Sequence, residues 1–472
     1  PAHAVVIGAG MAGLAAAQAL SRHVERVTLL DRDDVPDRAP VRATAAAGGH
    51  AHALRPGALA AIERLLPGFT ADLLAAGAVP IRLPEDMLWL SPAGWMPRFP
   101  ALDRHVFLSS SRELIECTLR RRVLDAPQVV VRPGLEVRGL RVGDGRVRAV
   151  EVRARHAGPG APSATIDADL VVDASGTCSP APSWIEAVGH APPPESTSDA
   201  GPAFACRLYR RAAGDTPGWK GALLQAGPGG GEREGALLPV EGGRWLLTLT
   251  GAHGDVPPAD EVGFLAFAHA LRSPDIARVV ARAEPLGPVA AYRPPPVRRR
   301  WYECQPHAVD GFLAVGGALG AVDPVAGQGL SVAALAAEAL DRRLAGHLAD
   351  RRDLRRFSAG AQRDVARIGD GSWRMATTGH RSSPAPRRTG RTPWARTGRS
   401  VRVRYERVVG AAALGDPRVN AALLDVVALL APPRSLRRPA VAARALGHRS
   451  PRPGPPPIWS CDASPNTAGA CW

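Results

Sequence analysis

The first 34 residues combine two short apolar runs, a glycine-rich turn and a segment with helical spacing. The stretch "AVVIGAGMAGLAAAQAL" (4–20) begins as a buried strand, turns on glycines and continues as a helix. The stretch "RVTLLDRDD" (26–34) is a second apolar run, and it ends in acidic residues. This order predicts a βαβ unit at the start of the chain.

The same patterns predict the elements that follow. Apolar residues at helical spacing predict helices over 57–78 and 112–124, with Ser111 as the N-cap of the second. Alternation on both sides of Gly143-Asp144-Gly145 predicts a β-hairpin over 135–155. The remaining predicted elements are strands at 168–176, 203–211, 243–251 and 312–317, a helix at 261–273 and a helical pair within 410–433.

The first glycine-rich turn fits a dinucleotide-binding fingerprint. Gly8, Gly10 and Gly13 have the spacing G-x-G-x-x-G, and Asp31 ends the next strand. The glycines allow a tight turn, a close approach to a pyrophosphate and close packing of helix on strand. An acid at the second strand end can accept hydrogen bonds from ribose hydroxyls and disfavours a 2′-phosphate. The pattern therefore predicts FAD or NAD rather than NADP.

A second glycine-rich loop precedes the helix that starts near residue 330. It contains Pro324, Gly327, Gln328 and Gly329, and the helix N-terminus offers donors to an electronegative group. A glycine-rich packing turn would explain the same residues. Asp173 likewise ends an apolar run, either as a ligand-facing residue or as an ordinary strand terminus. One long ligand such as FAD would explain both loops, with its ADP half at the first and its ring at the second.

These motifs together resemble the FAD-dependent aromatic-hydroxylase and epoxidase superfamily, and most closely its actinobacterial polyether-type olefin epoxidases. The resemblance rests on the fingerprint with Asp31, "ELIECTLRRR" after Arg112, "DLVVDASG" and "AVDPVAGQGLSVAAL". It covers roughly residues 3 to 430. It implies an α/β fold, in which a Rossmann-type FAD-binding domain carries an inserted mixed β-sheet substrate domain and a helical C-terminal region.

The resemblance also assigns residues to the cofactor. By position, the ADP half would be held by the fingerprint glycines and Asp31. The other positions that match cofactor-facing residues of the family are Arg42, Arg112, Asp173, Gly176, Pro324, Gly327, Gln328 and Gly329. No residue is assigned a catalytic role, and no metal site is expected.

Four positions depart from the family pattern, and one of them is Ala47, which replaces a glutamine of the arm. Gly49 replaces an arginine of the arm, Thr177 follows Gly176 where arginine is common, and Gly317 replaces the aspartate that binds the ribityl chain. One lost hydrogen bond to a charged group is worth about 1.5–3 kcal/mol, or roughly 10- to 100-fold in affinity. FAD is therefore expected to bind loosely.

The predicted domains follow from these assignments. Residues 1–180 would form the first part of the FAD-binding domain with the hairpin insertion, and 181–300 the substrate domain. The FAD-binding domain would resume over 301–370, followed by a basic helical region over 371–452 and a disordered tail over 453–472. The cluster of Met87, Trp89, Trp95, Met96 and Phe99 is either ordinary core or the lining of an apolar substrate cavity.

Composition bears on partners and compartment. The net charge of +15 is concentrated in residues 371–452, where 17 arginines face only Glu406, Asp416 and Asp425. This segment lacks interleaved aromatic residues, so a solvated or carrier-facing surface is favoured over nucleic-acid binding. The six scattered cysteines and the absence of a long uncharged apolar run favour a cytoplasmic protein without a transmembrane segment.

The predicted function is an FAD-dependent monooxygenase of specialised metabolism, such as antibiotic biosynthesis. It would transfer one oxygen atom from O2, by epoxidation or hydroxylation, to an apolar polyene, polyketide or terpenoid, free or carrier-bound. The electron donor would be NAD(P)H, directly or through a separate flavin reductase, because no second fingerprint is present. Two alternatives are a flavin dehydrogenase or reductase of the same fold, and a flavin-poor homologue acting as a non-catalytic binding subunit.

Overall fold

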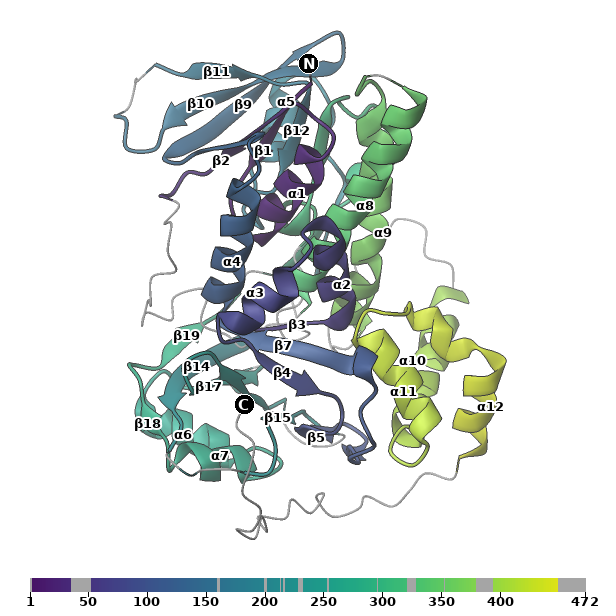
Figure 1. Ribbon diagram of the computed structural model, residues 1–472. Coiled ribbons are helices and arrows are strands. Elements are labelled where there is room, and N and C mark those ends of the chain that lie inside the picture. The colour runs from purple at the N-terminus through teal and green to yellow at the C-terminus, as the bar shows by residue number, and fades with distance from the viewer. Residues whose placement is uncertain are drawn as a thin grey trace.

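The fold combines a parallel α/β layer, a large mixed sheet and a group of C-terminal helices. The computed structural model describes residues 2–34, 52–158, 162–198, 202–212, 214, 217–227, 232–252, 254–294, 296–320, 328–351, 353–378 and 394–448. The parallel sheet and the mixed sheet lie at opposite ends of the molecule, and the C-terminal helices lie beside the mixed sheet (Figure 1). No helix in the described ranges is both long enough and apolar enough to cross a bilayer.

The parallel layer is a five-stranded sheet, and every neighbouring pair of its strands is parallel. Its strands, in spatial order, are β21 (Phe312–Ala314), β12 (Leu170–Asp173), β1 (His3–Ile7), β2 (Arg26–Leu30) and β8 (Val129–Arg132). Carboxyl ends of parallel strands meet at one edge, which is where ligands bind in such sheets. The segments that follow β1, β2, β12 and β21 therefore share that edge.

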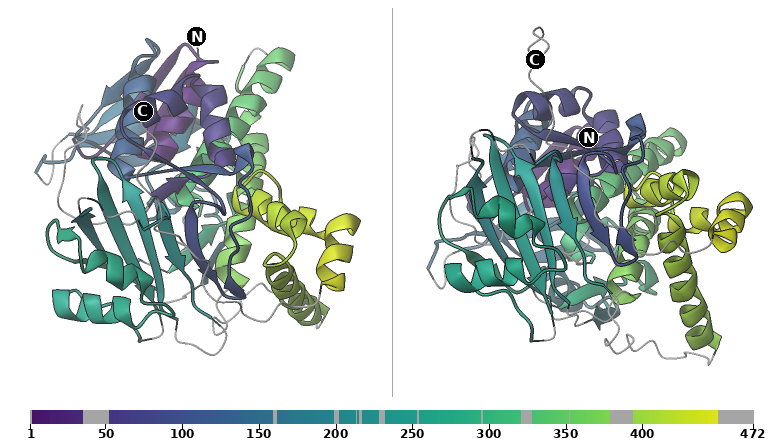
Figure 2. Two further views of the ribbon diagram at one scale, coloured as in Figure 1. Left: turned by 60° about the horizontal axis from the view of Figure 1, so that its bottom comes forward. Right: turned by 90° about the horizontal axis from the view of Figure 1, so that it is seen from below.

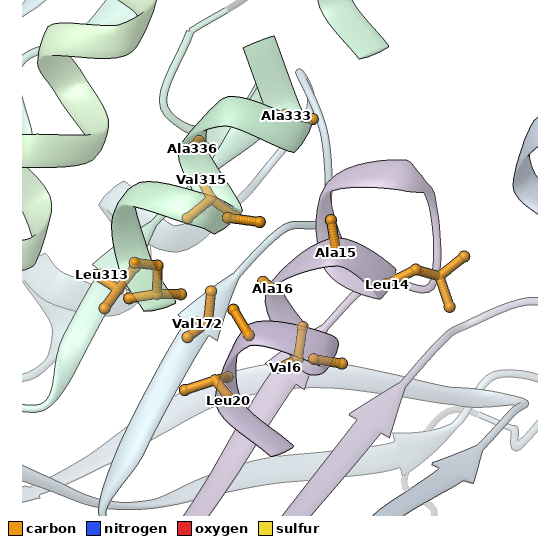
Figure 3. Close-up of a cluster of buried hydrophobic side chains, with 14 of the residues drawn as sticks. Val6, Leu14, Ala15, Ala16, Leu20, Val172, Leu313, Val315, Ala333 and Ala336 are labelled. Carbon is orange, nitrogen blue, oxygen red and sulfur yellow. The ribbon is translucent and has the colours of Figure 1, made fainter. Parts of the chain in front are cut away.

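Helices cover this sheet and build the main core. They are α1 (Met11–Ser21), α2 (Pro56–Leu65), α3 (Phe69–Ala75), α4 (Arg112–Leu124), α5 (Ala181–Ala187), α8 (Gly329–Asp350) and α9 (Phe357–Thr378). Small alanines such as Ala15, Ala16 and Ala336 let α1 and α8 approach buried Val172 of β12 and Val315, which directly follows β21, closely (Figure 3). The predicted Ser111 N-cap of α4 is confirmed, because its hydroxyl accepts a hydrogen bond from the Leu114 amide.

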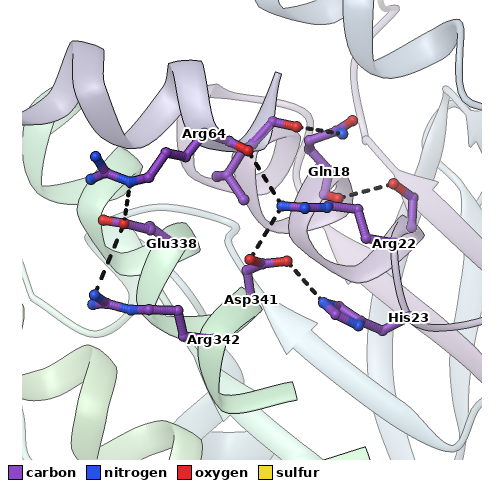
Figure 4. A network of polar contacts seen from close by, with 9 residues as sticks. Gln18, Arg22, His23, Arg64, Glu338, Asp341 and Arg342 are labelled. Carbon is purple, nitrogen blue, oxygen red and sulfur yellow. Dashed lines mark hydrogen bonds and ion pairs between the residues drawn. The ribbon is translucent and has the colours of Figure 1, made fainter. Parts of the chain in front are cut away.

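Polar contacts also connect the C-terminal end of α1 and helix α2 with α8. His23 and Arg22, at the end of α1, both contact Asp341 of α8, at 2.8 and 3.2 Å (Figure 4). Arg64 of α2 is 2.6 Å from Glu338 of α8. These partly exposed pairs fix the order of α1, α2 and α8 more than they add stability.

The predicted hairpin is also confirmed. Strands β9 (Leu135–Gly143) and β10 (Arg146–Ala154) are antiparallel, and β11 (Ala164–Asp167) pairs with β10. The two-residue turn between β9 and β10 is Asp144-Gly145, with φ of 54° and 70°. Positive φ at both residues is the requirement of a type I′ turn, which Asp-Gly satisfies.

The mixed sheet has eight strands. Its main path is β18 (Glu284–Pro285), β14 (Ala203–Arg210), β17 (Arg244–Gly251), β16 (Glu234–Val240), β15 (Gly221–Leu224), β5 (Met87–Ser91) and β6 (Gly94–Trp95), while β19 (Ala290–Tyr292) pairs with β14. Helices α6 (Glu261–His269) and α7 (Asp275–Val280) pack on it. The sheet thus includes β5 and β6, which precede the predicted 181–300 substrate domain; the domain boundaries stay a prediction.

Smaller elements join the two layers. Strands β3 (His52–Leu54), β7 (Val106–Ser110) and β4 (Val79–Arg82) form a three-stranded sheet, and β13 (Glu195–Ser198) pairs with β20 (Val297–Arg300). Short 3₁₀ turns are η1 (Asp103–His105), η2 (Tyr302–Cys304) and η3 (Gly316–Ala318).

The C-terminal region is helical, as predicted. It contains α10 (Trp394–Ala412), α11 (Pro417–Val427), the 3₁₀ helix η5 (Pro433–Arg437) and α12 (Pro439–Gly447). The views in Figure 2 place these helices at the side of the molecule, next to α9 and the mixed sheet. Asp425 of α11 accepts a hydrogen bond from Arg104 at 2.7 Å and is 2.8 Å from buried His105, which attaches the region to η1. The predicted tail over 453–472 lies outside the described residues.

Candidate functional site

The first turn of α1 forms the glycine cradle that the fingerprint predicts. Gly8 directly follows β1, has φ of 102° and lies against the backbone of Ala174 and Ser175. A Cβ on Gly13 would lie 1.7 Å from the Gly8 carbonyl oxygen, so only glycine allows helix and strand to pack this closely. Among the described residues, a Cβ on Gly10 would meet only the Glu116 side chain, at 3.9 Å.

Asp31 lies beside this cradle, at the carboxyl end of β2. Its Oδ2 accepts a hydrogen bond from the Ala9 amide at 2.6 Å, and its Oδ1 accepts one from the Asp33 amide at 2.9 Å. The carboxylate is therefore held next to the turn between β1 and α1. Each carboxylate oxygen can accept a further hydrogen bond, so ribose hydroxyls fit this position.

Glu116, which the sequence interpretation did not select, also reaches the cradle. Its Oε1 accepts hydrogen bonds from the Met11 amide at 3.3 Å and from the Arg112 Nε at 2.9 Å. Glu116, one helical turn after Arg112 in α4, therefore holds the Arg112 side chain near the N-terminus of α1. The four-residue spacing of Arg112 and Glu116 in α4 was the available sequence signal.

Asp173 ends β12 with its side chain in the protein interior, and its predicted role near the cofactor stays a prediction. Its side chain is fully buried and accepts hydrogen bonds from the hydroxyls of Ser175 at 2.6 Å and Ser179 at 2.5 Å. Burial raises the pKa of this carboxyl, although both serines favour its ionised form. Asp173 therefore shapes the turn that leads to Gly176 and faces the interior.

Gly176 and Gly317 lie against each other at the same edge of the sheet. Gly176 has φ of 91°, and a Cβ there would meet nothing within 4 Å. A Cβ on Gly317 would instead lie 2.9 Å from the Thr177 amide nitrogen and 3.1 Å from the Gly176 carbonyl carbon. Glycine at position 317 therefore lets the turn at Gly176 and Thr177 lie close to η3. An aspartate at position 317 would push this turn away.

The second glycine-rich loop is described only at its end. Gln328 is buried at the start of α8 and accepts a hydrogen bond from the Ser372 hydroxyl of α9 at 2.5 Å. Gly329 has open space where a Cβ would be. Arg42, Gly49, Pro324 and Gly327 lie outside the described residues, so their predicted contacts stay predictions.

A cavity of about 920 Å³ extends from Gln328 between the mixed sheet and the C-terminal helices. Its sheet side is mostly apolar, with a few polar residues of β16, β17 and the end of β15. The apolar residues include Ile81, Leu83, Met87, Trp89, Phe107 and Leu223, and the polar ones are Gln225, Glu234, Thr248 and Thr250. Its other side, from α9, α10, α11 and η5, is rich in arginine. The aromatic and methionine cluster was predicted to be either ordinary core or the lining of a substrate cavity, and its members differ in this respect. Met87 and Trp89 line the cavity, while Met96 is buried core beside Asn420.

Arg55 is a half-buried cation that lines this cavity. It precedes α2, its amide donates to the Ser331 hydroxyl at 3.4 Å, and its guanidinium donates to the Val427 carbonyl and lies 6.0 Å from the Phe107 ring centroid. Burial lowers the pKa of Arg55 to about 10, which leaves it protonated at neutral pH. No motif in the sequence identified this residue.

The described residues fit the adenine end of FAD. The open backbone at Gly10, the donors of α1 and the fixed carboxylate of Asp31 form a cradle for an ADP group. At the far end, the buried Gln328 and the open Gly329 begin a helix whose N-terminus adjoins the cavity. Across the described ranges, no group of three or more His, Cys, Asp or Glu side chains is placed to hold a metal ion.

Comparisons with known proteins agree with this geometry. The family model of the NAD(P)-binding Rossmann-like domain matches residues 6–72. The p-nitrophenol 4-monooxygenase PnpA from Pseudomonas putida has a similar structure, with a TM-score of 0.58, 16% identity and coverage of 90% of this chain and 97% of that chain. The myxobacterial chondrochloren halogenase CndH, described as a variant of FAD-dependent halogenases, has a TM-score of 0.59, 18% identity and coverage of 93% and 92%.

These similarities confirm the predicted fold class, which is that of FAD-dependent monooxygenases and halogenases. A relative from Mycobacterium tuberculosis, Protein Rv3254, is 32% identical over 359 residues, which are 72% of this chain and 73% of the relative. The chain therefore belongs to the same family as Protein Rv3254 and has the FAD-dependent monooxygenase and halogenase fold.

Proposed function

We propose that the protein is an FAD-dependent monooxygenase that transfers one oxygen atom from O2 to an apolar substrate. The observation that carries this proposal is the position of the cavity. Its walls include Gln328, at the start of α8, so a large apolar space adjoins the end of the site assigned to the flavin ring. A ring held there would face a substrate in the cavity.

Each part of the chain would have a distinct task. The glycine cradle and the first amides of α1 would bind the pyrophosphate, and Asp31 would accept hydrogen bonds from the adenosine ribose. Asp173, through Ser175 and Ser179, would keep the Gly176 turn in place. Arg112 would contribute positive charge beside the cradle, where Glu116 fixes its position.

The cavity would control the reaction by excluding water and orienting the substrate. When bound, FAD would supply the redox chemistry that activates O2. The apolar side chains of β5 and β7, such as Trp89 and Phe107, would keep the reacting end of the substrate in a dry environment. No residue of the cavity wall is assigned proton transfer.

The apolar sheet wall supports a polyene, polyketide or terpenoid as the substrate, and epoxidation of a double bond is the finer form of the proposal. The family resemblance adds the polyether-type epoxidases as a model for this chemistry. NAD(P)H would provide electrons, directly or through a separate flavin reductase.

The test is an oxygen-transfer assay with isotopically labelled O2. The protein is loaded with FAD and supplied with NADH or NADPH, with and without a flavin reductase, and with a polyene substrate. Gain of one labelled oxygen atom in the product supports the proposal. Oxidation or reduction of the substrate without labelled oxygen would instead support a dehydrogenase or reductase.

A second candidate function has its own structural basis. The close approach of Gly317 to the Gly176 turn, and the Glu116 carboxylate on the Met11 amide, both use space or donors near the cofactor path. They support a flavin-poor homologue that acts as a binding subunit. Such a protein would bind the apolar ligand but would gain no flavin absorption when FAD is added.

A further inference from the structure

The cavity has an asymmetric charge distribution that constrains its ligand. One side is the mostly apolar face of the mixed sheet, where Glu234 is the charged lining residue, whereas the facing side carries most of the charge. The arginines that line the cavity are Arg55, Arg367, Arg374, Arg402, Arg434 and Arg437. The lining carboxylates are Glu234, Asp370 and Glu406, so cations exceed anions.

The carboxylates are already engaged by protein groups. Asp370 lies 2.5 Å from the buried guanidinium of Arg299, and Glu406 lies 3.4 Å from Arg402. Glu234 accepts a hydrogen bond from the Ala226 amide at 3.2 Å. Acids also pair with three of the lining arginines: Arg402 with Glu406, Arg374 with Asp370 at 3.7 Å and Arg367 with Asp364 at 2.6 Å. At the exposed side of the cavity, the lining arginines without a described carboxylate partner are therefore Arg434 and Arg437.

The excess is concentrated on η5. Arg434 and Arg437 are three residues apart in a 3₁₀ helix, in which such positions lie on the same face. Both are exposed, and among the described residues no carboxylate lies within 4.0 Å of either guanidinium. The Tyr405 hydroxyl donates to the Leu436 carbonyl at 2.7 Å, which attaches η5 to α10. Two like charges held on one face repel each other unless an anion lies between them.

Burial gives the cavity a direction. Gln328 at one part of the wall is 3% exposed, whereas Arg434 and Arg437 are exposed at the surface. The arginines of η5 therefore mark the mouth, and Gln328 marks the inner end. A ligand with a charged end and an apolar body would enter with its body toward the flavin-facing end.

We propose that the substrate is an anionic amphiphile, whose apolar body occupies the sheet side of the cavity and whose anionic group binds Arg434 and Arg437 at the mouth. This inference rests on the proposed function for the reaction that follows, but binding itself requires no flavin. The anion is a carboxylate of a free acid or the phosphate of a carrier-type pantetheine arm, because guanidinium groups recognise both.

The binding test uses a conjugated polyene fatty acid, parinaric acid, whose fluorescence rises in an apolar site. Its methyl ester has the same apolar body without the charge, and the parinaroyl thioester of pantetheine 4′-phosphate carries the alternative anion. The variants are Arg434→Ala/Arg437→Ala and the control Arg404→Ala. Arg404 is exposed on α10 and does not line the cavity.

We expect one of the two anions to bind at least about tenfold more tightly than the methyl ester in the wild-type protein. This preference should fall to about twofold or less in the double variant, persist in Arg404→Ala and weaken in high salt. Preference for the free acid identifies a free substrate, and preference for the phosphate identifies a carrier-type arm.

Three outcomes would contradict the inference. They are equal binding of ester and anions, a preference that survives loss of both arginines, and failure of a folded protein to bind any probe. The second would move the anion to another cation such as Arg55. Because the assay needs no flavin, each outcome is independent of whether FAD binds or oxygen is transferred.

Discussion

At the residue scale, Asp173 shows that a side chain at the carboxyl edge of a parallel sheet can stabilise the turn that follows its strand. It ends β12, next to Ile7 of β1, but its carboxyl is fully buried and is hydrogen-bonded to Ser175 and Ser179. Its backbone position follows from the sequence pattern, because an apolar run that ends in "DASG" predicts a strand end. The direction of its side chain depends on serines that become neighbours only in the folded turn.

The buried carboxyl predicts a pH dependence of stability. Burial raises the pKa of Asp173 in the folded state, so its contribution is greatest where it is protonated in both states. The free energy of unfolding should therefore fall as pH rises through the folded-state pKa. Asp173→Asn cannot ionise, and its unfolding in urea should lack this part of the decline. An identical pH profile in wild type and variant would refute the assignment, with exposed Asp144→Asn as the control.

Gly13 gives a steric prediction. Because an added Cβ would lie 1.7 Å from the Gly8 carbonyl oxygen, Gly13→Ala forces α1 away from β1. Overpacking of this kind costs about 1–3 kcal/mol, measurable as a lower free energy of unfolding in urea. Gly346→Ala in α8 is the matched control, because a Cβ there meets nothing and alanine favours helix by about 0.5–1 kcal/mol. Equal stability of Gly13→Ala and wild type would contradict the close packing.

At the scale of elements, the C-terminal helices form a wall of the cavity. Their basic character predicts a solvated surface, and several of their arginines are exposed, but Arg402, Arg434 and Arg437 line the cavity. The region is attached to η1 through Asp425, which contacts Arg104 and buried His105. A change in this attachment should therefore affect the wall without affecting the parallel sheet.

Asp425→Asn tests this attachment. Burial would raise the pKa of Asp425, but the hydrogen bonds from Arg104 and His105 outweigh it and lower the pKa. Its stabilising effect is therefore present at neutral pH and is lost as pH falls through the folded-state value. At neutral pH, the variant should show amide hydrogen exchange in α11 that is faster by about tenfold or more, since a charge-assisted hydrogen bond contributes about 1.5–3 kcal/mol. Unchanged exchange in α11, or equal acceleration in α1, would contradict it.

The sequence is informative about elements and less so about their assembly. The βαβ unit, the Asp144-Gly145 hairpin and the Ser111-capped helix follow from local periodicity and turn chemistry. The pairing of β5 with β15, across more than 100 residues, has no local signal. The cavity mouth has no local sequence signal either, because η5 faces strands from the first third of the chain only after the C-terminal helices pack. Glu116 and Arg55 were missed because their roles depend on such contacts.

At the scale of the whole molecule, the proposed function requires one elongated site that connects the two layers. In the proposed function, the adenine end would be the glycine cradle of the parallel sheet and the ring end would be the start of α8. The cavity that Gln328 lines lies between the mixed sheet and the C-terminal helices. This order places cofactor, reacting group and substrate body in sequence. It also explains why the chain has two glycine-rich loops that are more than 300 residues apart in sequence.

The most direct test of this account is an absorbance titration of the purified protein with FAD. We expect flavin bands that reach about one equivalent, with weak or exchangeable binding because Gly317 stands where the resembled family has an aspartate. Asp31→Ala should weaken binding by roughly 10- to 100-fold, while retaining a wild-type melting temperature within a few degrees. A folded wild-type protein that gains no flavin band with excess FAD would contradict the account and would favour the flavin-poor binding subunit.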